Sequence, residues 1–415
     1  METIEGRSTA FTVKSLLLIQ IRLSCFLQIA SYPWIARSFD METPTTTAEV
    51  QSTSNFALQV ALRIRAAREE LSLTQEDLTG LMGFNDRQTL SAIETGERSV
   101  APGELTKLAR LLKKGVEYFT DPYVVTERQA FSYRARSNSS DVAEFESFAH
   151  RLISADRRFR QLLDEPGVPF CNQLNAIGKQ SSLSLAAMAG EATGRSLKLG
   201  CPPADSLRDA IQSQLKINLF YVDAPATISG AACHLPDGNY ILINRREPSF
   251  RRNFNAGHEL FHLLTWNVMP PDRLDLITTG DDRPKSEKMA DNFSAGLLMP
   301  ADQIVIRFRQ RPESTDIHDW ILALGKEFRV SGEAVYWRLT NLGQPVKSVD
   351  PAKLSRYDET GRDGTPLLFN DEFVNRLHQV LIHGYVSVRK AASVLGIGPD
   401  ELYGVVEAHG MDAAF

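Results

Sequence analysis

The sequence predicts a multidomain fold, with an all-α helix-turn-helix head, a central α+β domain and a small α-helical C-terminal module. Its 415 residues exceed the roughly 100–200 residues of an ordinary domain. Apolar residues recur at helical spacing near both ends of the chain, whereas the centre combines such helices with two β-type runs, 217–222 and 240–244. Hydrophobic residues make up 43% and charged residues 23% of the chain, which excludes a mostly disordered, collagen-like or multi-span membrane protein.

Net charge and cysteine usage restrict the environment and the partners. The formal net charge of -5 provides no general attraction to nucleic acid or acidic lipid, so any DNA contact depends on a local surface. The cysteines are scattered without a Cys-x-x-Cys pair, at positions Cys25, Cys171, Cys201 and Cys233. This spacing indicates a reducing compartment, and neither a disulfide framework nor a cysteine zinc site. We therefore expect a cytoplasmic protein with no membrane partner.

Residues 1–54 are predicted to form a leader in front of the first folded domain. The stretch 10–36 is apolar-rich, but Lys14 and Arg22 interrupt it before about 18 apolar residues accumulate. The stretch is therefore interpreted first as upstream sequence translated ahead of a true start at Met41. A disordered or interfacial tail and a secretory signal are the alternatives.

Residues 55–122 are predicted to form a helical domain. Apolar residues repeat at helical spacing until Gly83 interrupts the pattern. Helices over 75–82 and 87–94, joined by this turn, have the arrangement of a helix-turn-helix, and another helix is expected over 102–112. In such a motif the early residues of the second helix lie in the major groove. The polar side chains opposite the apolar face of this helix include Arg87, Gln88, Thr89 and Ser91.

Two runs in this domain resemble the lambda-repressor-like (XRE) DNA-binding domain, Leu73-Thr-Gln-Glu-Asp-Leu78 and Arg87-Gln-Thr-Leu-Ser-Ala-Ile-Glu-Thr-Gly96. The resemblance implies that Gln75 contacts the phosphate backbone of an operator-type double-stranded DNA. It also implies that Arg87, Gln88 and Ser91 face the major groove, where Arg and Gln suit bidentate pairing with base edges.

The charge of this domain bears on how it would bind DNA. Residues 55–122 contain nine Lys and Arg against ten Asp and Glu, so a single copy should bind weakly. We therefore expect a homodimer that reads paired half-sites. A helical bundle used for protein contacts is the alternative.

Residues 123–204 are interpreted as a helical connector. A helical pattern runs over 142–163, and at least one more helix is expected over 180–200. The aromatic and arginine residues at 129–136 are interpreted as a packed linker and not as a nucleic-acid contact. No chemistry is assigned to this segment.

The strongest chemical motif is His258-Glu259-Leu260-Phe261-His262. No helix-breaking residue follows Gly257, and residues four apart lie on one face of a helix, so His258 and His262 can direct two imidazoles at one zinc ion. Glu259 then lies beside a water whose pKa zinc lowers toward about 7, where a carboxylate can accept its proton. An ordinary helix with exposed histidines is the alternative, and a third ligand is needed to decide between them.

A second helix downstream supplies that third ligand. An apolar stripe at helical spacing runs to Pro300, and Glu287 and Asp291 lie four residues apart on one side of this helix. Glu287 then completes a His, His, Glu set with an open fourth position, as expected of a catalytic zinc site. Asp291 is placed to accept a ring N–H from a ligand histidine. The alternative for both carboxylates is a solvated helix face.

The wider pattern resembles the ImmA/IrrE family of metallopeptidases, which is of the gluzincin type. The resemblance covers residues 205–344 and includes the runs 228–231, 240–244, 251–254, 287–293, 297–300, 328–331 and 334–339. It implies an α+β gluzincin-like metallopeptidase domain with Zn2+ held by His258, His262 and Glu287. It also implies that Glu259 is the general base and that the substrate is a regulatory protein, often a repressor.

Two further expectations accompany this resemblance. The run Asn255-Ala-Gly257 departs from the Thr-containing run common before the motif, which affects the first turns of the histidine helix. The short sheet of the family would be formed by 217–222 and 240–244, and its edge could hold an extended peptide by strand addition. Main-chain pairing of this kind needs little side-chain recognition, so it specifies no cleavage site.

Residues 345–415 are interpreted as a linker followed by a helical module. The stretch 346–366 is polar and turn-rich, and helical patterns follow over 373–382, 387–395 and 400–407. The last two have the spacing of another helix-turn-helix, but a three-helix docking or dimerisation module is the favoured interpretation. The histidines of this module are too isolated to indicate a metal site, namely His378, His383 and His409.

Together these features predict a DNA-binding transcriptional regulator with a zinc-dependent endopeptidase domain that hydrolyses a repressor-like protein. One alternative is a transcription factor whose peptidase fold is a non-catalytic sensor or dimerisation unit. Another is a peptidase whose N-terminal head recruits a protein partner instead of DNA.

Overall fold

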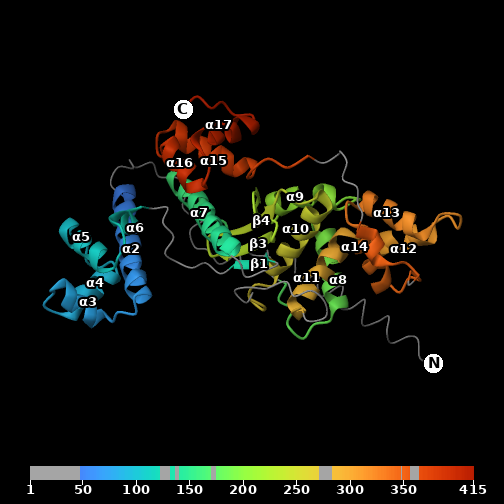
Figure 1. The fold of residues 1–415 in the computed structure, drawn as a ribbon, viewed down its shortest axis with the longest axis horizontal. Coiled ribbons are helices and arrows are strands. Elements are labelled where there is room, and N and C mark those ends of the chain that lie inside the picture. Colours follow the sequence, from blue (N-terminus) through green and yellow to red (C-terminus); the bar gives the residue numbers. More distant parts are fainter. Residues whose placement is uncertain are drawn as a thin grey trace, which may run out of the picture.

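The computed structural model describes residues 47–121, 131–135, 140–169, 174–270, 283–346, 348–355 and 364–415. Most of the predicted leader, including the proposed start at Met41, lies outside these residues. The described chain forms a helical head, a mixed sheet with helices on both faces, and further helices at the other end (Figure 1). Within these described ranges, no helix is long and apolar enough to cross a membrane.

The helical head contains the helix-turn-helix that the sequence predicts. Its helices are α2 (Thr47–Glu70), α3 (Gln75–Met82), α4 (Arg87–Glu94), α5 (Pro102–Leu111) and α6 (Val116–Thr120). Thr74 caps α3 by accepting a hydrogen bond from the backbone N–H of Asp77, and Asp86 caps α4 in the same way. Gly83 ends α3 with a φ of 71°, a left-handed conformation that glycine adopts readily. Because α2 begins at Thr47, it extends into the segment assigned to the leader.

The mixed sheet is larger than the two strands that the sequence predicts. Its strands are β1 (Phe131–Ala135), β2 (Asn218–Val222), β3 (Ile228–Leu235) and β4 (Gly238–Asn244), in the order β1-β3-β4-β2. β3 runs antiparallel to both β1 and β4, whereas β2 runs parallel to β4. The two predicted strands correspond to β2 and β4. Residues 131–135, which belong to the stretch interpreted as a packed linker, form β1 and pair with β3, a strand that the sequence did not predict.

One face of the sheet packs on four helices, two of which carry the predicted metal-binding residues. These helices are α8 (Leu183–Ser196), α9 (Ala204–Ser213), α10 (Ser249–Leu264) and α11 (Lys285–Leu298). Ile241 and Ile243 of β4 enter this core, where Phe261 of α10 and Phe293 of α11 are fully buried. The chain then continues through α12 (Ala301–Arg309), α13 (Ile317–Phe328), α14 (Gly332–Asn341) and η1 (Pro351–Ser355).

Two segments outside the predicted 205–344 domain belong to this same core. Helix α8, from the predicted connector, packs against α11 more extensively than any other described pair of elements. The two helices approach so closely that a Cβ on Gly190 would lie 2.0 Å from the carbonyl oxygen of Phe293, so only glycine fits at this position. Val346, Val349 and Leu354 are also buried in this core, so the first part of the predicted linker is a packed segment.

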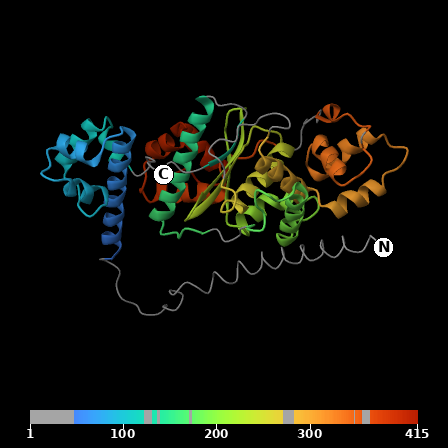
Figure 2. The same cartoon turned by 90° about the horizontal axis from the view of Figure 1, so that it is seen from below.

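The opposite face of the sheet packs on α7 and the C-terminal helices (Figure 2). These helices are α7 (Ser140–Leu162), α15 (Asp371–Ile382), α16 (Val388–Leu395) and α17 (Pro399–Ala408). Asp156 of α7 is fully buried and accepts hydrogen bonds from Arg376 of α15 at 2.7 Å and from the Tyr240 hydroxyl of β4 at 3.0 Å. A buried charge pair and a shared core therefore connect the C-terminal helices to the sheet.

Candidate metal centre and nucleic-acid interface

Helix α10 places both histidines of the predicted motif on one buried face. The helix begins after Pro248, which cannot donate a backbone hydrogen bond and so suits the start of a helix. His258 and His262 lie one turn apart, and their exposed fractions are 1% and 3%. The alternative of a helix with exposed histidines is therefore excluded.

Helix α11 brings a carboxylate to these two imidazoles. The Nε2 atoms of His258 and His262 are 3.1 Å apart. Glu287 places Oε2 at 3.1 Å from the Nε2 of His258 and Oε1 at 3.0 Å from the Nε2 of His262. The structure thus brings together the three residues predicted to bind metal, and it buries all of them.

The donor set fits a zinc ion in both chemistry and size. Two imidazole nitrogens and one carboxylate form a common ligand set of catalytic zinc sites. A tetrahedral ion with bonds of about 2.0–2.1 Å separates its ligand atoms by about 3.3 Å. The separations of 3.0–3.1 Å between the present donor atoms are close to this value. Modest outward movement of the side chains is therefore sufficient to accommodate the ion.

The charge state of Glu287 suits a metal ligand. Burial by itself raises the pKa of this carboxyl, but the imidazoles of His258 and His262 outweigh burial and hold the pKa well below its ordinary value. In the metal-free site these imidazoles therefore favour the ionised carboxylate, which is the form that a metal ligand requires.

Asp291 orients the first of the two histidines. Its Oδ1 lies 2.9 Å from the Nδ1 of His258, while its Oδ2 accepts a hydrogen bond of 2.6 Å from Arg283. In the tautomer with its proton on Nδ1, His258 donates a hydrogen bond to this carboxylate. Its Nε2 then carries a free lone pair, which is directed at the centre of the donor set. Arg283 is a contact that sequence reasoning missed, because no motif marks it.

Glu259 follows His258 directly in α10 and lies against strand β3. Its side chain is fully buried. A Cβ on Gly230 of β3 would come within 3.1 Å of Oε1 of Glu259, so a glycine at this position leaves the room that the carboxylate occupies. Gly230 falls within the run 228–231 of the resemblance, but no pattern in the sequence indicates its close approach to Glu259.

The run Asn255-Ala-Gly257 has a structural role in the first turns of α10. Asn255 donates a hydrogen bond of 2.6 Å to Glu247, whose other carboxylate oxygen accepts one of 2.7 Å from Ser229 of β3. At Gly257 a Cβ would lie 2.6 Å from the Ser294 hydroxyl of α11. These residues therefore bind α10 to β3 and allow α11 to approach closely.

A second cluster of possible metal donors lies in the described residues at the start of α13. It consists of Asp316, His318 and Asp319, of which the two aspartates are exposed. Asp316 caps α13 by accepting hydrogen bonds from the backbone N–H groups of the other two. The capping role explains this cluster without a metal.

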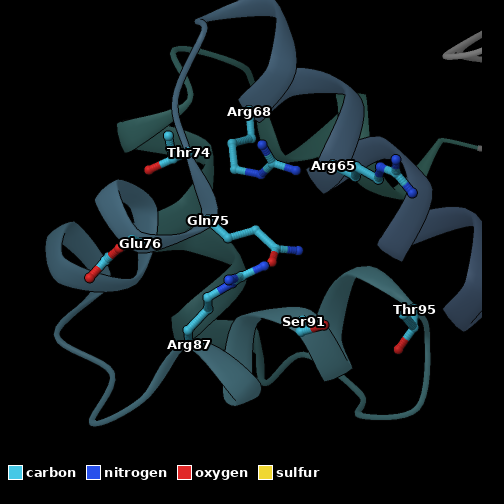
Figure 3. A pocket seen from close by; sticks show the side chains of 8 residues that line it. All are labelled: Arg65, Arg68, Thr74, Gln75, Glu76, Arg87, Ser91 and Thr95. Atoms are coloured by element: carbon cyan, nitrogen blue, oxygen red, sulfur yellow. The ribbon is translucent and has the colours of Figure 1, made fainter.

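The helix-turn-helix presents a hollow of about 550 Å³ on its surface (Figure 3). It is lined by Arg65, Arg68, Thr74, Gln75, Glu76, Arg87, Ser91 and Thr95. Three of the predicted DNA-contacting residues, Gln75, Arg87 and Ser91, thus meet in one place. Two hydrogen bonds hold the amide group of Gln75. Its oxygen accepts one of 3.0 Å from Arg87, and its nitrogen donates one of 2.9 Å to Glu94.

The two remaining predicted DNA-contacting residues lie elsewhere on α4. Gln88 is exposed and does not line the hollow. Thr89 donates hydrogen bonds to Asp86 from its backbone N–H at 2.8 Å and from its hydroxyl at 3.1 Å. Arg65 and Arg68 of α2 were missed, although both line the hollow with Arg87. Arg68 is buried and paired with Glu94 at 2.6 Å, whereas Arg65 is exposed.

Two family models match the chain. A helix-turn-helix model matches residues 64–119, and the IrrE N-terminal-like domain model of peptidase family M78 matches residues 212–340. Among curated proteins nothing matches.

Two solved structures of regulators are also similar to the chain. One is the apo form of the competence regulator ComR from Streptococcus vestibularis, with 11% identity, a TM-score of 0.15, and coverage of 86% of this chain and 100% of that one. The other is the PrgX/iCF10 complex, with 10% identity, a TM-score of 0.15, and coverage of 86% and 98%. Scores this low carry no argument about fold or function.

Proposed function

Because this chain joins an XRE-type helix-turn-helix domain to an IrrE/ImmA-like peptidase domain, we propose that it is a DNA-binding regulator that hydrolyses another protein. The observation that carries the proposal is the convergence of His258, His262 and Glu287, three buried residues of which the first precedes the buried Glu259 in α10. A structural helix has no need to bury two imidazoles against a carboxylate, because burying such groups costs free energy that must be recovered.

The proposed chemistry is hydrolysis of a peptide bond in a gluzincin-type site. His258, His262 and Glu287 would hold a zinc ion, which when bound supplies a Lewis acid that acidifies water and polarises the carbonyl group. Glu259 takes the proton of the attacking water on a carboxylate oxygen and passes it to the leaving amine. Asp291 keeps His258 in the tautomer that directs Nε2 at the metal.

The proposed substrate is a repressor-like regulatory protein, and the proposed DNA partner is an operator-type site. The head would hold the peptidase domain close to an operator, where such a repressor is concentrated. Two copies of the chain would double the number of phosphate contacts, which compensates for the low net charge of one head. The exposed Arg65, which lines the hollow beside Arg87, supports a phosphate contact at this surface.

Metal content tests the proposed centre directly. We expect about one zinc ion per chain in the purified protein and well below one in Glu287→Ala, because one of the three donors is then missing. Elemental analysis after zinc loading and removal of excess measures this. Asp319→Ala is the matched control, since it removes an exposed carboxylate of the second cluster and should leave the zinc content unchanged. A parent protein that retains no zinc would contradict the proposed centre.

DNA binding tests the proposed interface of the head. We expect Arg87→Ala to weaken binding to a DNA selected from a random library by about 1–3 kcal/mol, as for the loss of one good contact to a base edge. Fluorescence anisotropy at fixed salt, with the full chain, measures the change. Arg110→Ala is the control, because Arg110 is an exposed arginine of α5 outside the hollow. If no DNA is selected, the head recruits a different partner, whereas two variants that both bind like the parent would contradict the role of Arg87.

A further inference from the structure

Strand β3 lies against the proposed general base. Gly230 of β3 lies against Glu259, and Ser229 beside it is hydrogen-bonded to Glu247, which in turn holds Asn255 of the histidine helix. An extended chain that pairs with β3 at Gly230 is therefore brought alongside the catalytic site. Neighbouring strands lie about 4.8 Å apart, so a chain one strand further out would be too distant to reach Glu259.

The outer edge of β3 is paired with β1. The pairing is antiparallel, with Ser132 opposite Ala232, Tyr133 opposite Ala231 and Arg134 opposite Gly230. The register shifts between Arg134 and Ala135, so the regular pairing ends beside Gly230. Thus β1, which follows the helix-turn-helix head in the sequence, passes directly along the proposed site.

The opposite edge of the sheet is closed by the segment that leads into α15. The backbone N–H of Phe369 donates a hydrogen bond of 2.7 Å to the carbonyl oxygen of Tyr221 in β2. The side chain of Asn370 donates another of 3.1 Å to the carbonyl oxygen of Leu219. A peptide that adds to this sheet next to the site must therefore take the place of β1.

We propose that the outer edge of β3 is the binding groove for an extended substrate strand, and that β1 occupies this groove as an internal competitor. The inference rests on the proposed peptidase function, because it assigns the groove to the substrate of that site. The occupant is a segment of the same chain, paired in the antiparallel direction through main-chain hydrogen bonds. Substrate binding then requires release of β1. Because β1 lies between the head and the peptidase domain in the sequence, the state of this strand controls access to the site.

The strength of this competition follows from the covalent attachment of β1. A tethered strand competes at an effective concentration of the order of millimolar, whereas a free peptide is commonly supplied at micromolar concentration. Weakening the β1 pairing by one main-chain hydrogen bond is therefore expected to improve the apparent affinity for a free peptide about tenfold, equivalent to about 1.4 kcal/mol.

Proline substitutions in β1 test the proposal. In an antiparallel ladder successive residues direct their N–H groups alternately toward and away from a given neighbour, so either Ser132 or Tyr133 donates to β3. Ser132→Pro and Tyr133→Pro are therefore a matched pair, of which one removes a hydrogen bond to β3. Both are placed in the full chain with Glu259→Gln, which prevents cleavage. The probe is a fluorescent synthetic peptide with the sequence of residues 127–139.

The expected result is binding of this probe about tenfold more tightly to at least one proline variant than to the Glu259→Gln parent. Hydrogen exchange should then show that the probe protects the amides of β3 in that variant, which also establishes that the protein is folded. Equal or weaker probe binding in both folded variants would overturn the proposal. Binding does not require hydrolysis, so this test judges the groove independently of cleavage, and the peptidase function is judged separately by the zinc content and by the Glu259→Gln variant.

Discussion

Replacing Glu259 with glutamine is expected to lower protein hydrolysis by about 10²–10⁴-fold, the contribution of a well-placed general base. Glutamine has nearly the same shape, so the fully buried position beside Gly230 can accept it without repacking. It cannot accept the proton of the attacking water. Because the metal donors are other residues, the zinc content is expected to stay at that of the parent.

The loss of hydrolysis can be measured without a known substrate, by comparing the new protein N-termini that appear in cells expressing the parent or the variant. Termini that appear when the parent is expressed should be absent with Glu259→Gln at equal protein levels, while DNA binding is retained. Glu333→Gln is the matched control, because Glu333 is an exposed residue of α14 and its replacement should leave the new termini in place. Identical termini and normal regulation with Glu259→Gln would favour a transcription factor whose peptidase fold acts as a non-catalytic sensor.

Local signals in the sequence were sufficient for the helices of both motifs. The bounds predicted for α3 and α4 are those observed, because Thr74 and Asp86 cap the helices and Gly83 ends the first of them. The spacing of four residues between His258 and His262, and between Glu287 and Asp291, likewise fixes a helix face from sequence alone. The predicted fusion of an XRE-type domain to an ImmA/IrrE-type domain is confirmed by the family models.

The missed features are those that depend on contacts far apart in the sequence. β1 is a short segment whose identity as a strand comes from pairing with β3, about a hundred residues later, and no local pattern encodes such a partner. The contact of Arg283 with Asp291 depends on the way the chain returns before α11. The burial of Val346 and Leu354 likewise depends on a core assembled from distant helices, although the segment that contains them is polar and turn-rich.

The sequence predicts which residues form the candidate site, but it does not predict the distances between them. Each helix face follows from spacing, but the distances that bring Glu287 to both imidazoles follow from the packing of α10 on α11. That packing depends in turn on small residues, since Gly257 of α10 lies against Ser294 and Gly190 of α8 lies against Phe293. The metal centre is therefore expected to be sensitive to substitutions that touch none of its ligands.

Gly190→Ala is expected to show this sensitivity, by lowering the free energy of unfolding by about 3 kcal/mol. The added Cβ would lie 2.0 Å from the carbonyl oxygen of Phe293 and 2.8 Å from the backbone nitrogen of Leu297, so two helix backbones must separate. Helix α11 carries Glu287 and Asp291, and its displacement should also weaken zinc binding. Both effects can be measured on the full chain, by urea unfolding followed by circular dichroism and by zinc titration.

Gly194→Ala makes the same chemical change one turn later on α8 and serves as the control. Its added Cβ would lie 3.5 Å from the nearest atoms, including the side chain of Leu297, which is ordinary van der Waals contact. Alanine favours a helix over glycine by about 1 kcal/mol, so this variant should be as stable as the parent or more stable. If both substitutions instead have the same small effect, the α8–α11 contact tolerates a methyl group, and the metal centre does not depend on the close approach of these helices. A large loss confined to Gly190→Ala places the support of the metal centre in a helix that lies outside the predicted peptidase domain.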